Sequence, residues 1–163
     1  MFNEFNDLPL HPLAIHAAVV LIPLAALLGM LFAVPLTRAW ARLPLALVSV
    51  AAAGATYVSK ESGERFEDVL QLGGEPAALI ATHEERANVL FILVLVFAVL
   101  AVAAYVVARA TSSAAVVNGL AVLLVVGAVA IAVQTYRVGE IGSRAVWNPT
   151  GDADFSGSAP SSR

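Results

Sequence analysis

The chain has 163 residues and a net charge of −3, with 60% hydrophobic and 13% charged residues. Soluble domains carry about 25% charged residues, so this composition is typical of a protein embedded in a membrane. The chain has no cysteine, which excludes disulfides, iron–sulfur clusters, thiolate metal sites and a cysteine nucleophile. Its acidic balance offers no broad basic surface, and we therefore expect no nucleic-acid partner.

Four long stretches contain no Asp, Glu, Lys or Arg: residues 13–34, 43–59, 89–108 and 114–135. Each is long enough for a helix to cross a hydrocarbon core of about 30 Å. They are apolar on every face, which favours helices over barrel strands, because barrel strands alternate apolar and polar residues. The sequence therefore predicts an all-α protein, an integral membrane four-helix up-down bundle over residues 1–147, whose main partner is the lipid bilayer.

Prolines mark the ends of the first helix. His11 precedes Pro12, and a residue before proline is disfavoured in the helical conformation, so we expect His11 just outside the helix and Pro12 as its first residue. Pro35 is expected to end this helix. Residues 35–42 are then predicted to form a short loop before the second helix.

The other connections differ in length. Residues 109–113 form a second short loop, and residues 60–88 form a longer connection. The second helix can extend through residues 60–70, and the third is expected to begin near Glu75 and Pro76, giving it a length of about 50 Å. Residues 148–163 are polar and rich in Gly, Ser and Pro, which predicts a disordered tail.

The charges are distributed unequally between the two sides of the predicted bundle. All 12 acidic residues fall on the side of the termini, whereas the opposite side carries only Arg38, Arg42 and Arg109. A dense basic loop region favours the cytoplasmic face, although six Lys or Arg residues on the other side favour the reverse. We expect a plasma (inner) membrane protein with both termini on the non-cytoplasmic side, and the opposite orientation stays open.

The three histidines, His11, His16 and His83, are all predicted near the interface on the side of the termini. Imidazole ligates haem iron, zinc or copper without help from thiolates. We expect His16 and His83 to point toward each other across the first and third helices, with Glu64 or Glu140 near enough to join them. Histidines with a purely structural role at the interface are the alternative.

The sequence contains no pattern that predicts an enzyme. No carboxylate lies deep within a span, so transport through the bundle is not expected. Phosphate loops, nucleophile elbows, zinc protease motifs and dinucleotide fingerprints are absent. No catalytic residue is therefore predicted.

The opening motif, residues 8–16, reads LPLHPLAIH. It resembles the start of an uncharacterised bacterial four-helix membrane family called domain of unknown function 2231, and the resemblance extends over residues 8–147. It implies a histidine pair at the first helix (His11 and His16), a histidine before the third (His83), and a glycine-rich stretch after the fourth (residues 139–142). That stretch commonly carries histidine in the family, whereas this chain has Glu140 there. The resemblance implies no established activity.

Two hypotheses follow for the function. In the first, a small membrane protein binds haem b through His11, His16 and His83, or a divalent metal through His16, His83, Glu64 and Glu140. In the second, a non-catalytic subunit packs beside a larger respiratory or transport complex, or beside itself. The second hypothesis depends on small residues spaced for close helix contact, such as Ala25, Gly29 and Ala33. A classical enzyme ranks below both.

Overall fold

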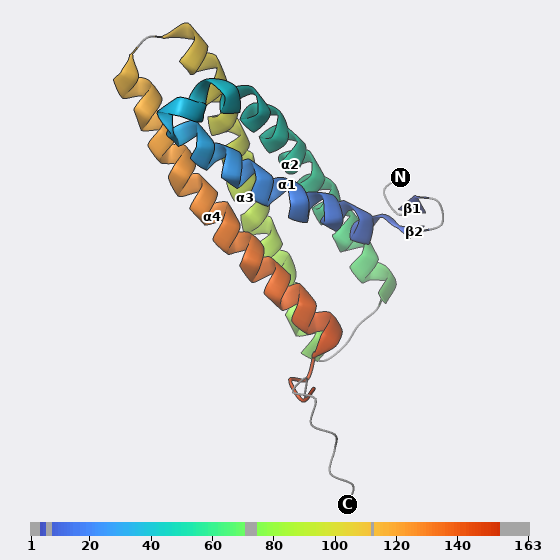
Figure 1. The fold of residues 1–163 in the computed structure, drawn as a ribbon. Coiled ribbons are helices and arrows are strands. Elements are labelled where there is room, and N and C mark those ends of the chain that lie inside the picture. Colours follow the sequence, from blue (N-terminus) through green and yellow to red (C-terminus); the bar gives the residue numbers. More distant parts are fainter. Residues whose placement is uncertain (1–3, 6–7, 71–74, 112, 154–163) are drawn as a thin grey trace, which may run out of the picture.

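The computed structural model describes residues 4–5, 8–70, 75–111 and 113–153, and these form four long helices packed as an up-down bundle (Figure 1). The helices are α1 (Leu10–Ala33), α2 (Pro35–Leu70), α3 (Glu75–Ala110) and α4 (Ala114–Trp147). Two short strands precede them, β1 (Glu4–Phe5) and β2 (Leu8–Pro9), which pair antiparallel. The predicted all-α four-helix fold is confirmed, whereas the two strands were not predicted.

Each helix packs chiefly on two neighbours. Helix α1 contacts α2 and α4, and α3 contacts the same two helices from the opposite side. Helices α1 and α3 therefore lie diagonally across the bundle and run in the same direction. We call the end where α1 and α3 begin the terminal end, and the end where α2 and α4 begin the loop end (Figure 1).

All four helices are long and apolar enough to cross a membrane. Their outer faces carry large apolar side chains that are more than half exposed, such as Val20, Leu27, Val99 and Val126. Side chains of this kind on every outward face suit contact with lipid rather than with water. The protein is therefore a four-helix membrane-spanning protein.

Two predicted helix starts, those of α1 and α2, differ from the structure. Helix α1 begins at Leu10, so the expectation that His11 lies outside the helix is wrong. The first turn of a helix has no intrahelical partners for its N–H groups, so it constrains its residues least. The expected loop at residues 35–42 is also wrong, because α2 already begins at Pro35. Proline needs no N–H partner at the first helical position, so the chain turns within Val34 alone.

The longer helices agree with the sequence. Helix α2 extends through Leu70 and α3 begins at Glu75, as predicted. Helix α4 continues to Trp147, well beyond the predicted span. Residues 148–153 form a turn and a bend, and the rest of the predicted disordered tail, residues 154–163, lies outside the described residues.

Phe97 fills the middle of the bundle. It comes from α3 and is 1% exposed, and its ring packs against Gly29 of α1 and Gly127 of α4. A Cβ atom at either glycine would lie 2.9 Å from the ring. The two glycines therefore provide the space that the ring occupies, and Phe97 joins the two diagonal helices.

Only some of the small residues predicted to support helix contacts are buried inside the bundle. Ala25 and Gly29 face the core, whereas the space around Gly54 and Gly119 is open. These two glycines lie on outward faces of α2 and α4. Ala25, Gly29 and Gly127 thus serve the interior of the bundle, whereas Gly54 and Gly119 remain uncovered.

We expect Gly127→Ala to destabilise the bundle by roughly 1–3 kcal/mol, because the added methyl group overlaps the Phe97 ring. Combining it with Phe97→Leu should recover part of the loss. Gly119→Ala is the matched control on the same helix and should cost nothing. Thermal unfolding of the detergent-solubilised variants measures the difference, and equal melting temperatures for Gly127→Ala and Gly119→Ala would contradict the packing described.

Candidate functional site

His11 lies against α2 at the terminal end of the bundle. Its Nδ1 is 2.9 Å from the carbonyl oxygen of Ser59 and 3.4 Å from Oγ of Ser62. The imidazole ring lies over Gly63, where a Cβ atom would approach the ring Cε1 to 2.8 Å. The first turn of α1 is thus fixed to α2 by a histidine whose ring lies in the space left open by a glycine.

His83 makes the same arrangement with α4. Its Nδ1 is 3.1 Å from the carbonyl oxygen of Val138. The ring lies over Gly142, where a Cβ atom would be 3.0 Å from Cε1. In both cases the glycine follows the accepting carbonyl by four residues, one helical turn further along.

The contact of His11 with Gly63 in the α1–α2 hairpin corresponds to the contact of His83 with Gly142 in the α3–α4 hairpin. In each hairpin the first helix carries the histidine, and the second carries the carbonyl and the glycine. Helices α1 and α3, which carry the two histidines, are diagonal in the bundle and run in the same direction. The two rings are close enough that a positive charge on His83 would act on His11.

The hydrogen bonds fix the form of both rings. A carbonyl oxygen only accepts, so Nδ1 must be the donor in each histidine. In the neutral ring the other nitrogen, Nε2, then carries the lone pair. Metal-bound histidines almost always donate their second ring N–H to a carbonyl, a carboxylate or water in this manner. Both histidines are therefore held in the tautomer that ligates through Nε2.

A second hydrogen bond supports the position of His83. The side chain of Gln134 on α4 is buried and donates from Nε2 to the carbonyl oxygen of Arg86 on α3, at 2.9 Å. Helices α3 and α4 are thus linked in both directions, from His83 to Val138 and from Gln134 to Arg86. These two bonds fix the rotation of α3 against α4, and hence the direction of the imidazole.

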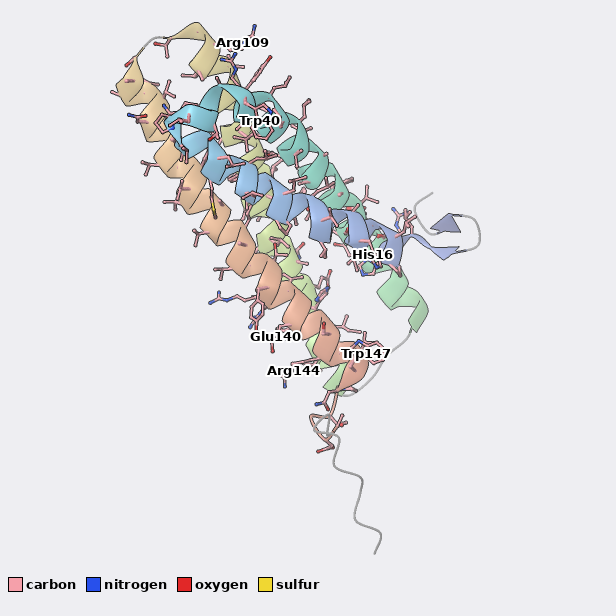
Figure 2. The ribbon with its side chains drawn as sticks, in the orientation of Figure 1. His16, Trp40, Arg109, Glu140, Arg144 and Trp147 are labelled. Carbon is pink, nitrogen blue, oxygen red and sulfur yellow. The ribbon has the colours of Figure 1, made fainter. Side chains whose placement is uncertain are left out.

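His16 does not join this pair. Its side chain is exposed near the start of α1 (Figure 2), and its Nδ1 hydrogen bonds to the carbonyl oxygen of Pro12 on the same helix. The prediction that His16 faces His83 is wrong, because the His16 side chain lies on the outward face of α1. Five residues separate His11 from His16, which corresponds to about 140° around a helix of 3.6 residues per turn. The two rings therefore cannot both face the bundle.

The predicted acidic residues are paired on their own helices. Glu64 forms an ion pair with Lys60, and Glu140 lies 3.7 Å from Arg144. In each pair the partners are four residues apart, a spacing that places both on one helix face. The described residues contain no group of three or more His, Asp or Glu that could hold a metal ion. The structure therefore does not assemble the predicted cluster of His16, His83, Glu64 and Glu140.

The part of the site that sequence reasoning missed is the pair of glycines. Gly63 and Gly142 stand in helical segments where a glycine has no local advantage, since it costs about 1 kcal/mol relative to alanine. A glycine in the second helix of each hairpin, with a histidine at the same depth in the first, was the available signal. Only the packed helices show which histidine meets which glycine.

Comparisons with family models, with curated proteins and with solved structures find no match to this chain. The resemblance of its opening motif to domain of unknown function 2231 stays a prediction.

We expect Gly63→Ala to displace the His11 ring and break its hydrogen bond to Ser59, because the new methyl group would lie only 2.8 Å from the ring Cε1. Gly54→Ala is the control on the same helix, at a position with open space. The Gly63 variant should be less stable than the control by about 1–2 kcal/mol, the sum of a lost hydrogen bond and steric overlap. Thermal unfolding in detergent gives the difference.

The contact of His83 with Gly142 allows an independent repeat of this measurement. Gly142→Ala should displace His83, whereas Gly139→Ala should not, because nothing lies within 4 Å of a Cβ atom there. If either control is as destabilised as its partner, the close contact between ring and glycine is not what stabilises the terminal end.

Proposed function

We propose that this protein is a membrane haem protein in which His11 and His83 would hold a b-type haem. The observation that carries the proposal is the matched pair of imidazoles on diagonal helices, each with Nδ1–H bound to a carbonyl oxygen. Helical bundles hold cofactors in this way, between side chains of facing helices. The proposal replaces His16 by His11 in the predicted ligand pair.

Haem suits the available ligands better than a bare metal ion. A structural zinc ion takes four protein ligands, and the described residues offer no suitable cluster of even three. In haem the porphyrin supplies four nitrogens, so the iron needs only two axial imidazoles from the protein. Two histidines without further ligands are therefore sufficient for haem and insufficient for zinc.

Small residues at this end of the bundle support the proposal. Gly63 and Gly142 let the two imidazole rings lie close to the backbones of α2 and α4. Further along α1 from His11, the inward residues are Ala14 and Ala18, and both are buried and small. When bound, haem would supply one-electron redox chemistry. The chain's own contribution would be to hold both imidazoles in one tautomer and to exclude lipid.

A second candidate is a non-catalytic subunit that packs against other membrane helices. Gly54 and Gly119 favour it, because both lie on outward faces and a Cβ atom at either would meet nothing within 4 Å. Small residues of this kind let a neighbouring transmembrane helix approach closely. This candidate requires no cofactor, so measuring bound haem separates it from the first.

We expect the protein purified from membranes in mild detergent to show a Soret band. His11→Ala and His83→Ala should each reduce the bound haem at least tenfold, because each removes one axial ligand. His16→Ala is the matched control and should retain the haem, since its side chain is exposed. Circular dichroism should show unchanged helix content in all three variants. A Soret band that is lost in the His16 variant, or one that is absent from the native protein, would contradict the proposal.

We also propose that both termini lie on the non-cytoplasmic side, with Arg38 and Arg42 retained in the cytoplasm at the loop end. The chain has no native cysteine, so single cysteines report sidedness directly. In intact cells Thr150→Cys should react with a membrane-impermeant maleimide, whereas Leu36→Cys should react only after the membrane is opened. The reverse pattern would contradict the orientation, and labelling of both from one side would contradict the bundle.

A further inference from the structure

The loop end of the bundle contains an arginine that reaches across three helices. Arg38, in the first turns of α2, donates from Nε to the carbonyl oxygen of Phe32 at 3.0 Å and from Nη2 to that of Ala33 at 3.2 Å. Both carbonyls belong to the end of α1, where the last turn lacks intrahelical donors. Its Nη1 also donates to Oδ1 of Asn118 on α4, at 3.0 Å. The guanidinium is thereby held between α1 and α4.

The charge of Arg38 has no acidic partner at this end of the bundle. The sequence contains no Asp or Glu between residues 8 and 60, or between residues 86 and 139, so the whole loop end lacks carboxylates. The acceptors of Arg38 are neutral amide oxygens, and Arg42 and Arg109 add two further positive charges at this end. A cluster of cations near a membrane surface attracts anionic lipid headgroups.

A hollow of about 300 Å³ lies beside the guanidinium. Its polar rim consists of Arg38 and Asn118, and its apolar wall is formed along α4 by Ala121, Val122, Val125 and Val126. These residues follow Asn118 along α4, away from the loop end and into the apolar span. The hollow thus has a cationic end at the membrane surface and an apolar end within the hydrocarbon.

We propose that this hollow binds an anionic phospholipid, with its phosphate on Arg38 and Asn118 and an acyl chain against the valines of α4. A guanidinium has five N–H donors, of which three are used by Phe32, Ala33 and Asn118, so two remain for a phosphate oxygen. Asn118 uses its amide oxygen for Arg38, which leaves its NH₂ group as a further donor. A group with an anionic head and a long apolar tail matches both ends of the hollow.

Native mass spectrometry of the full chain, with phosphatidylglycerol or phosphatidylcholine added in equal amounts, tests the proposal. The native protein should retain phosphatidylglycerol in preference to phosphatidylcholine. Arg38→Gln should weaken phosphatidylglycerol binding roughly tenfold, because charge-assisted hydrogen bonds to the phosphate are lost. Arg137→Gln is the charge-matched control, since Arg137 lies exposed on α4 toward the terminal end and does not line the hollow.

A second pair of variants tests the hollow without changing Arg38. This pair is needed because the loss of Arg38 also removes its hydrogen bonds to the last carbonyls of α1. Val126→Trp should fill the hollow and reduce phosphatidylglycerol binding, because Val126 lines it and is already 63% exposed. Leu123→Trp, at similar depth on α4 but outside the hollow, should bind as the native protein does. Equal retention of both lipids, or undiminished binding by both Arg38→Gln and Val126→Trp, would overturn the proposal.

Sodium phosphate provides the remaining comparison. Phosphatidylglycerol should raise the melting temperature of the detergent-solubilised protein, and the same concentration of sodium phosphate should not. Equal stabilisation by the two would show an anion site with no part for the acyl chain, and would overturn the assignment to a lipid.

Discussion

Inside a bilayer every polar group must find its partner within the protein, and this requirement organises the bundle. The helices satisfy most of the backbone internally. Three of the remaining polar side chains use neighbouring backbone carbonyls: His11 and His83 bind those of the adjacent helix in each hairpin, and Arg38 binds those at the end of α1. Each of these bonds joins two helices, so the few polar residues also determine how the helices are rotated against each other. An unpaired group would cost about 1–3 kcal/mol in the same place.

The large rings inside the bundle pack against glycines. The Phe97 ring in the middle of the bundle packs against Gly29 and Gly127, and the histidine rings at the terminal end pack against Gly63 and Gly142. At each contact a Cβ atom would come within about 3 Å of the ring. Each ring thus fills a space that exists because the facing residue is a glycine. This fit is more selective than contact between aliphatic residues.

The two ends of the bundle differ in chemistry. Among the described residues, the terminal end carries the imidazoles and all the carboxylates, whereas the loop end carries three arginines and no acid. Figure 2 shows Trp40 and Arg109 at the loop end, with Glu140, Arg144 and Trp147 at the other. A ligand pair at one end and a cationic hollow at the other assign the proposed haem and the proposed lipid to opposite surfaces of the membrane. Each of the two proposals can therefore be tested without the other.

The amino-acid sequence was sufficient to predict four transmembrane helices, because long apolar stretches without charge leave no other structure in lipid. It also placed all three histidines near one interface. Which histidine faces inward became visible only in the packed bundle. The helices are apolar all round, so their hydrophobic pattern does not fix their rotation, and His16 was as good a candidate as His11. The contacts of His11 with Gly63 and of His83 with Gly142 fix that rotation, and they depend on residues about 50 to 60 positions apart in the chain.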